Sequence, residues 1–198
     1  MYTVQTEEEF REEALVFFRK NCKYLTAQYP FDILSMAFDY VKNNDDPCYR
    51  YKEKDKFKLY RPLAKKKELK FRTNFFGGIL EGYEQLPHRG KLLIVTKSRK
   101  DVMTLHSLGY NAVSVRSENT PMSENAFELL KHRFEQIILW FDPDSAGIQG
   151  ASKMQKLYGL PLFNYDGKYG KDPSDIYRDN GVNKLIEICK QLEIVLKQ

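Results

Sequence analysis

The segment from residue 136 to 157, QIILWFDPDSAGIQGASKMQKL, sets the strongest limit on the fold of this 198-residue chain. Ile137–Phe141 is a continuous run of apolar residues rich in β-branched and aromatic side chains, which predicts a short strand buried on both faces, as in a parallel sheet. From Ser145 onward apolar residues recur at helical spacing, and Asp144 or Ser145 can cap that helix. The carboxylates of Asp142 and Asp144 therefore lie between a buried strand and a helix N-terminus.

Two interpretations of this acid pair stay open. In the first, one aspartate caps the helix and the other is a solvated turn residue. In the second, the pair binds a cation, because two carboxylates on one turn repel each other unless a cation joins them. Mg²⁺ favours one or two such oxygens together with water and phosphate. The neighbouring Pro143 and the small Ala146–Gly147 pair favour the second interpretation.

Short apolar runs and longer amphipathic stretches alternate through the second half of the chain. This alternation predicts βαβ units, and therefore an α/β fold with a parallel sheet and helices on its faces. The expected strands cover residues 92–95, 112–115, 137–141 and 161–163, and the expected helices cover residues 98–108, 124–132, 145–157 and 182–196.

Polar residues follow each expected strand. Ligands of open α/β sheets bind outside the carboxyl ends of the strands, so these residues are expected to meet at one edge of the sheet. They are Thr96–Ser98, Arg116–Glu118, Asp142 with Asp144, and Asp166–Lys168 leading into Lys171–Asp175.

A basic segment precedes this domain. Between Arg50 and Arg72 lie eleven basic and three acidic residues, so this window carries +8 and the remainder −3, within a net charge of +5. Its period of two predicts short antiparallel strands over residues 48–73, with Lys52, Lys54, Lys56 and Lys58 on an outer face and apolar residues, Phe71 among them, on an inner face.

A solvated charged face would give the same pattern, but the interleaved aromatic residues favour single-stranded nucleic acid. Lysines would neutralise phosphates, and aromatic rings would stack on unpaired bases. The residues expected to contact nucleic acid are Lys52, Lys54, Lys56, Lys58, Arg61, Lys70 and Arg72.

The rest of the chain completes the expected organisation. Amphipathic helices are predicted at residues 7–20 and 33–41, and a glycine-rich connector at 74–90 separates an N-terminal domain, residues 1–88, from an α/β domain, residues 89–198. The three cysteines form no C-x-x-C pair, so no zinc site is expected, and their odd number favours a reducing compartment. No signal peptide or membrane-spanning run is visible, so we expect a cytoplasmic protein without membrane contact.

Two motifs resemble those of a known family. The D-P-D-S-A-G element at residues 142–147 resembles the acidic motif of the Toprim domain, a metal-binding module of bacterial and phage primases, topoisomerases and some nucleases. The K-D-P-S-D element at residues 171–175 resembles the K-D-P-x-D/E segment of primases. The lysine-rich strands before residues 82–87 resemble the nucleic-acid-binding subdomain of phage primases. The resemblance implies a Toprim-like (Rossmann-like) parallel sheet with flanking helices, preceded by a small α+β basic subdomain.

The same resemblance implies a DNA primase core, an enzyme that joins NTPs into short RNA primers on a single-stranded DNA template. By it, Asp142, Asp144 and Asp172 would hold Mg²⁺ or Mn²⁺. One of two ions would activate the attacking 3′-oxygen and the other would stabilise the leaving pyrophosphate. Lys168, Lys171 and Asp175 are expected at the nucleotide, although a solvated loop is an alternative for both lysines. A replicative helicase and a separate zinc-binding subunit are the implied protein partners.

The sequence departs from the family at the pattern V-E-G-x-x-D, where the glutamate's place falls on Lys97 or Thr96. Lys97 cannot ligate Mg²⁺ and would instead hold a phosphate electrostatically. Glu118 is the candidate for the missing carboxylate. Asp101 keeps the last acid of the pattern and is expected to support the site. The catalytic candidates are therefore Asp142, Asp144, Lys97 and Asp101, with Asp142, Asp144, Asp172 and Glu118 as candidate metal ligands.

Two other functions remain open from the sequence. The chain could be a non-catalytic nucleic-acid-binding subunit of a replisome with a degenerate Toprim site, which Lys97 favours. It could also be a Toprim nuclease, which the basic N-terminal segment disfavours. The number of carboxylates at the sheet edge distinguishes an enzyme from a binding subunit.

Overall fold

The structure is a computed structural model that describes residues 38–41, 48–53, 56–60, 65–66, 70–73, 80–117 and 120–195. The chain divides into two compact units, Met1–Phe76 and Gly77–Gln198. The boundary expected after residue 88 therefore falls inside the second unit. The helix expected at residues 7–20 lies outside the described residues.

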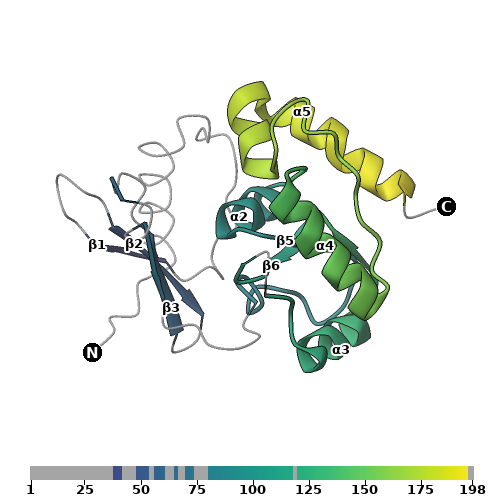
Figure 1. Ribbon diagram of the computed structural model, residues 1–198, viewed down its shortest axis with the longest axis horizontal. Coiled ribbons are helices and arrows are strands. Elements are labelled where there is room, and N and C mark those ends of the chain that lie inside the picture. Colours follow the sequence, from purple (N-terminus) through teal and green to yellow (C-terminus); the bar gives the residue numbers. More distant parts are fainter. Residues whose placement is uncertain are drawn as a thin grey trace. The chain divides into compact units, whose positions relative to one another are not determined.

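The first unit contains a four-stranded antiparallel sheet, as the period of two predicts (Figure 1). The helix predicted at residues 33–41 is wrong for its last four residues, which form the first strand. Their sequence, FDYV, is aromatic and β-branched and fits a pleated surface next to a partner strand. In sheet order the strands are β1 (Phe38–Val41), β2 (Cys48–Glu53), β3 (Lys56–Tyr60) and β4 (Phe71–Thr73).

The single lysine face expected in this sheet is not formed. The β2–β3 register pairs Lys52 with Phe57 and Lys58 with Tyr51, and directly paired positions share a face while neighbours alternate. Positions 52 and 58 therefore belong to opposite faces. Phe71, expected on the inner face, is 47% exposed, and the Lys58 ammonium lies 5.0 Å from the centre of its ring.

The second unit contains a parallel sheet in the order β6-β5-β7, which confirms the predicted α/β fold (Figure 1). Leu162 adds one parallel bridge to Leu139, so the strand expected at 161–163 is reduced to a single bridge. The segment at 80–81, expected in a connector, pairs with β6 through Glu81 and Ser114. The strands are β5 (Gly90–Thr96), β6 (Asn111–Ser114) and β7 (Phe134–Leu139).

Helices follow these strands as predicted. The last helix begins at Pro173 rather than residue 182 and continues across Gly181, whose φ of 77° interrupts the helical geometry. Among the described residues, no helix is both long and apolar enough to cross a membrane. The helices are α2 (Arg99–Ser107), α3 (Glu124–Arg133), α4 (Ser145–Tyr158) and α5 (Pro173–Val195).

The sheet buries both of its faces, which explains why its strands are continuous apolar runs. Alternate residues such as Val95, Val113 and Leu139 form one core with α3 and α4, and Tyr158 closes it by donating a 2.6 Å hydrogen bond to the Met122 carbonyl. The intervening residues, among them Ile94 and Ile138, are equally buried on the other face. There α2 packs against both β6 and α5. The helices on the two faces of the sheet hold in place the carboxyl ends of its strands, where the polar residues lie.

Candidate active site

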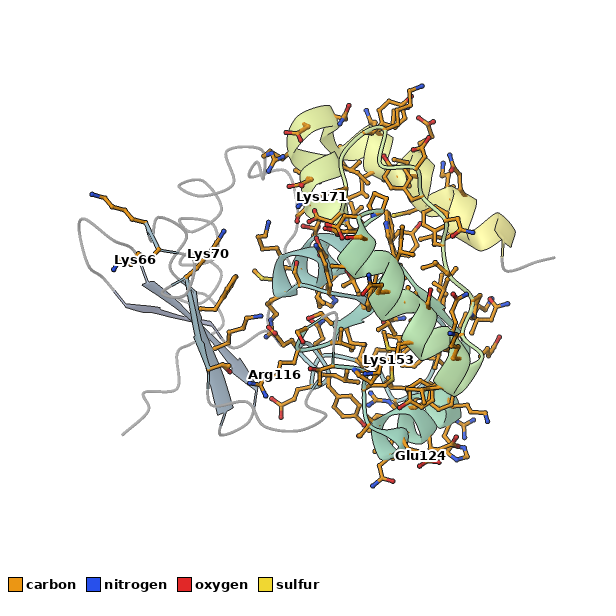
Figure 2. The ribbon with its side chains drawn as sticks, viewed as in Figure 1. Lys66, Lys70, Arg116, Glu124, Lys153 and Lys171 are labelled. Atoms are coloured by element: carbon orange, nitrogen blue, oxygen red, sulfur yellow. The ribbon has the colours of Figure 1, made fainter. Side chains whose placement is uncertain are left out.

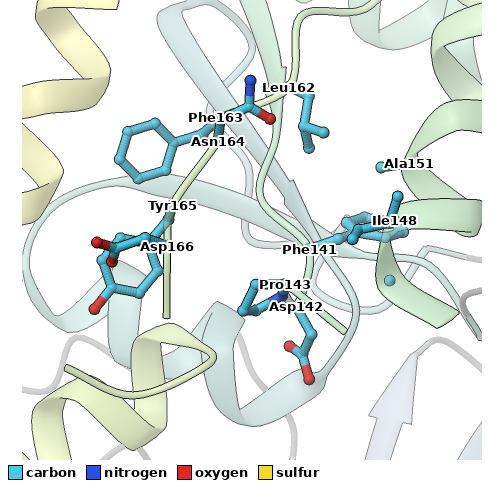
Figure 3. Close-up of a pocket in the computed structure, with 11 residues that line it drawn as sticks. Phe141, Asp142, Pro143, Ile148, Ala151, Leu162, Phe163, Asn164, Tyr165 and Asp166 are labelled. Atoms are coloured by element: carbon cyan, nitrogen blue, oxygen red, sulfur yellow. The ribbon is translucent and has the colours of Figure 1, made fainter. Parts of the chain in front are cut away.

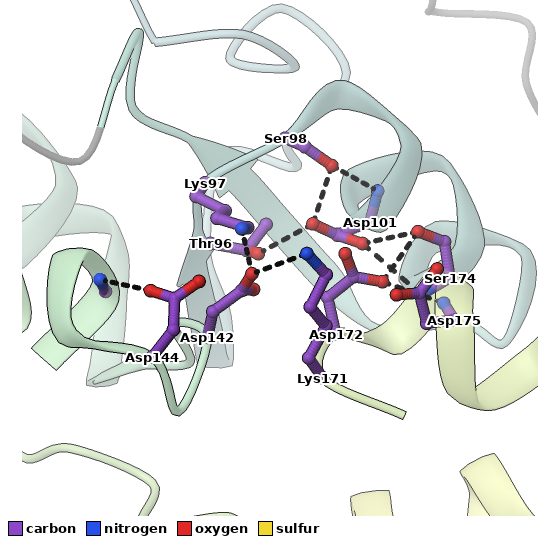
Figure 4. Close-up of polar contacts among 11 residues, drawn as sticks. Thr96, Lys97, Ser98, Asp101, Asp142, Asp144, Lys171, Asp172, Ser174 and Asp175 are labelled. Atoms are coloured by element: carbon purple, nitrogen blue, oxygen red, sulfur yellow. Dashed lines mark hydrogen bonds and ion pairs between the residues drawn. The ribbon is translucent and has the colours of Figure 1, made fainter. Parts of the chain in front are cut away.

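Lys97 and Asp142 meet because their strands are parallel neighbours. β5 ends at Thr96, and β7 lies beside it in register. The Trp140 amide still donates to the Val95 carbonyl at 2.9 Å, which extends the alignment past the end of β7. Both strands therefore deliver their next polar side chain to the same point of the edge (Figure 4).

Asp142 is the buried centre of the site, with its side chain 1% exposed. Lys97 Nζ donates to Asp142 Oδ2 in an ion pair, and Lys171 Nζ lies 3.8 Å from the same oxygen. Burial raises the pKa of Asp142, whereas the Lys97 ammonium acts in the opposite direction. Asp142 Oδ1 is buried as well and accepts no hydrogen bond from any residue that the structure describes.

Asp144 takes the capping role that the sequence allowed. Its Oδ1 accepts a 2.9 Å hydrogen bond from the Gly147 amide, and this bond lowers the pKa of the carboxyl. Gly147 itself permits the close approach of α4 to the acidic turn, because a Cβ at this position would lie 2.2 Å from the Asp142 carbonyl oxygen. The glycine of the D-P-D-S-A-G element is therefore required because any side chain at this position would clash with the backbone of Asp142.

Asp101 is fully buried at the start of α2 and is held by hydroxyl groups from two directions (Figure 4). Its Oδ2 accepts from Ser98 Oγ at 2.6 Å and from Thr96 Oγ1 at 3.3 Å. Its Oδ1 accepts from Ser174 Oγ at 2.7 Å and from the Ser174 amide at 3.3 Å. Burial, together with nearby Asp172, raises the pKa of Asp101 to about 7. These hydrogen bonds hold the Asp101 carboxyl at the start of α2.

Asp172 caps α5 and joins this network. Its Oδ1 accepts from the Asp175 amide at 2.7 Å and lies 2.9 Å from Ser174 Oγ, so Asp101 and Asp172 share the single hydroxyl hydrogen of Ser174. Pro173 occupies the first position of α5, where the amide hydrogen that proline lacks would have no partner within the helix. Asp175, expected at the nucleotide, instead directs Oδ1 to Arg178 Nη1 at 2.7 Å. We call Asp101, Asp142, Asp144 and Asp172 the acid cluster.

The remaining predicted site residues are described only in part. Lys168 places its ammonium 5.2 Å from the Tyr169 ring and has an exposed side chain. Glu118 lies outside the described residues. Of the basic residues expected to contact nucleic acid, Lys58 and Lys70 have described side chains, and Lys70 is labelled in Figure 2. The side chains of Lys52, Lys54, Lys56, Arg61 and Arg72 fall outside the description.

Sequence reasoning assigned no role to Ser98 and Ser174, the hydroxyls that hold Asp101. A signal existed for Ser98, because S-x-x-D is the spacing of a capping box, and its Oγ indeed accepts from the Asp101 amide at 3.3 Å. No local sequence pattern predicts the contact of Ser174 with Asp101, because the two residues are 73 positions apart.

A pocket of about 300 Å³ opens beside the acidic turn (Figure 3). Ile148 and Ala151 of α4 form one wall, and the segment from Leu162 to Asp166 forms another. The pocket is mainly apolar and reaches the acid cluster only through Asp142.

Within the described part of the chain, no group of three or more Asp, Glu, His or Cys side chains is gathered as a metal centre. The acid cluster nevertheless offers hard oxygen donors for one ion. Asp142 has the unpartnered Oδ1, and the Asp144 carboxylate has a second oxygen beyond the one that caps α4. Because Mg²⁺ commonly takes one or two carboxylates and completes its shell with water and phosphate, the residues fit a single ion of this kind.

The comparison with known families agrees with this architecture. Residues 94–177 match the Toprim-like family model. Two curated sequences similar to this chain are DNA primases. That of Rickettsia bellii is 36% identical over 104 residues, which are 48% of this chain and 17% of the relative. That of Campylobacter jejuni is 33% identical over 107 residues, 51% of this chain and 17% of the relative.

The resemblance to Toprim-domain primases is thereby confirmed, although the matched part is 17% of the length of these relatives. Among solved structures, the Escherichia coli primase catalytic core aligns with a TM-score of 0.60 at 19% identity, covering 91% of this chain and 73% of that one. The primase fragment of the bacteriophage T7 primase-helicase protein aligns with a TM-score of 0.59 at 18% identity, covering 79% and 69%. These likenesses confirm the fold.

Proposed function

We propose that this chain is the catalytic core of a DNA primase, which joins ribonucleotides into short primers on single-stranded DNA. One observation carries the proposal: Asp142 and Asp144 stand with Lys97 and Lys171 at the carboxyl edge of a Toprim-like sheet. The similarity to DNA primases over about half of this chain supports the same activity.

In this proposal the acidic residues bind the metal ion and the basic residues bind phosphate. Asp142 and Asp144 would hold Mg²⁺ or Mn²⁺, which when bound activates an attacking oxygen and neutralises charge on the phosphates. Lys171 has a 56% exposed side chain beside Asp142 and would bind the polyphosphate of an incoming nucleotide. Asp101 and its hydroxyl partners fix the start of α2, and with it the position of Lys97.

The basic residues of the first unit would bind the template, since each cation that neutralises a phosphate strengthens binding in a salt-dependent way. Lys65 and Lys66 have exposed side chains, and the exposed Phe71 ring beside Lys58 offers a stacking surface. A replicative helicase and a zinc-binding subunit remain proposed partners.

A non-catalytic subunit is the second candidate, and the Lys97–Asp142 ion pair favours it because a lysine neutralises the central carboxylate. Primer synthesis separates the two. Labelled NTPs, Mg²⁺ or Mn²⁺ and a mixed-sequence single-stranded template are incubated with the protein and with Asp142→Asn. We expect short products from the wild type and none from the variant. If neither makes products while both bind template, alone and with a replicative helicase, the chain is a binding subunit.

Asp144 has a capping role and a proposed metal-binding role, which two substitutions separate. Asp144→Ser keeps an N-cap oxygen and should retain the stability of the wild type, whereas Asp144→Ala should lose about 1 kcal/mol. Both lack the carboxylate, so both should lose about a hundredfold in primer synthesis, as when one group that stabilises developing charge is removed. Thermal melting and the primer assay are measured together. An Asp144→Ser variant of full activity would limit Asp144 to capping.

A further inference from the structure

Lys97 differs from Lys171 in how firmly it is held. The Lys97 side chain is 18% exposed and is ion-paired with an Asp142 side chain that is 1% exposed. Lys171 reaches the same Oδ2 atom only at 3.8 Å and is 56% exposed. A cation that is partly withdrawn from water and paired with a buried carboxylate is costly to displace, because removing it leaves an uncompensated buried charge. Lys97 is therefore the resident cation of the site.

Charge balance limits what else can bind. Lys97 and Lys171 already bring two positive charges to Asp142, the buried carboxylate of the acid cluster. In the absence of a nucleotide, each divalent ion adds two more positive charges beside these lysines, so a second ion binds against a growing excess of positive charge. A second divalent ion bound at Asp142 Oδ2 would meet the Lys97 ammonium at contact distance, a repulsion that amounts to several kcal/mol.

We propose that Lys97 takes the place of one divalent ion, so that the substrate-free protein binds at most one Mg²⁺ or Mn²⁺ at the acid cluster. The ion shares Asp142 with the lysine, using the oxygen that accepts no hydrogen bond within the described residues. This inference rests on the proposed function for its choice of metal. It concerns ion binding and can be tested without primer synthesis.

The test is an equilibrium titration with Mn²⁺ in the absence of nucleotide, in which the signal of free Mn²⁺ counts the ions bound per chain. Lys97→Glu replaces the resident cation with a carboxylate, and we expect this variant to bind one more Mn²⁺ than the wild type. Adding Asp142→Asn to that variant should lower the number of bound ions, which places the binding at the acid cluster. Lys91→Glu, an exposed change on the same strand, should leave the number unchanged.

Two results would overturn the proposal: a wild type that binds two Mn²⁺ ions at the cluster, or a Lys97→Glu variant that binds the same number as the wild type. If Lys97→Glu does not fold, Lys97→Met serves instead. It removes the charge without adding a ligand and should raise Mn²⁺ affinity at least about tenfold. Unchanged affinity would contradict the proposal. An extra ion in Lys97→Glu together with a wild type inactive in primer synthesis would reject the proposed function alone.

Discussion

Gly147→Ala is expected to lose about 2 kcal/mol of stability or more, although it places a better helix former in α4. The added Cβ would lie 2.2 Å from the Asp142 carbonyl oxygen and 3.0 Å from the Asp142 carbonyl carbon. These are backbone atoms, so the clash cannot be relieved by turning a side chain. Overpacking of this kind costs about 1–3 kcal/mol or more, which exceeds the gain of up to about 1 kcal/mol from replacing a helical glycine.

To relieve this clash, the backbone at Asp142 would have to shift, and its carboxylate would move relative to Lys97. Primer synthesis should therefore fall together with stability. Urea unfolding gives the first quantity and the primer assay the second. Gln149→Ala, an exposed change in the same helix, is the matched control and should behave as the wild type. A Gly147→Ala variant that unfolds at the wild-type urea concentration would show that α4 can shift away from the acidic turn without cost.

Asp101→Asn is expected to remove a large pH dependence of stability. Burial raises the pKa of this carboxyl to about 7 in the folded protein, well above its ordinary value of 3.8. Below pH 4 both states carry the proton, and no difference arises. As the pH rises from 4 to 7, the unfolded chain ionises while the folded protein holds its proton, so the folded state loses stability. Above pH 7 the loss is constant, and three pH units correspond to about 4 kcal/mol.

An asparagine can keep the hydrogen bonds of Asp101. Its carbonyl oxygen replaces Oδ1 as acceptor for Ser174, and its amide group donates to the hydroxyls of Thr96 and Ser98, which can rotate to accept. The free energy of unfolding of both proteins is measured from pH 4 to pH 8. The variant should gain on the wild type by several kcal/mol across this range. Parallel profiles would mean that Asp101 ionises normally, and Asp166→Asn, an exposed change, controls for the loss of an acid.

Local sequence was sufficient for much of the second unit. The apolar run before Asp142 predicted a buried parallel strand, and the polar residues after it predicted the edge where the site lies. Strand β7 begins at Phe134, three residues earlier than predicted. The prediction missed this start because the exposed Glu135 and Gln136 interrupt the apolar run. The helix after Pro173 was placed too late for a similar reason, since Gly181 interrupts its helical geometry.

Long-range contacts limited the prediction of the site. Lys97 and Asp142 are 45 residues apart, and the sequence alone suggested a phosphate as the partner of this lysine rather than an aspartate. The prediction of a lysine face in the first unit failed because β2 and β3 are separate antiparallel strands, with Glu53 paired to Lys56. This pairing sends position 52 to one face and position 58 to the other, which counting along one continuous strand cannot reveal.

The hydrogen bonds between Asp101 and Ser174 have a consequence for biosynthesis. A chain leaves the ribosome from its N-terminus, so α2 and the β5–β7 sheet emerge well before Ser174, which follows Asp101 by 73 residues. Until α5 docks, Oδ1 of Asp101 has neither of its partners, and the buried end of α2 has to remain hydrated. The acid cluster is therefore completed only after the start of α5 has been synthesised, and a ribosome stalled before residue 172 would carry a nascent chain with an incomplete acid cluster.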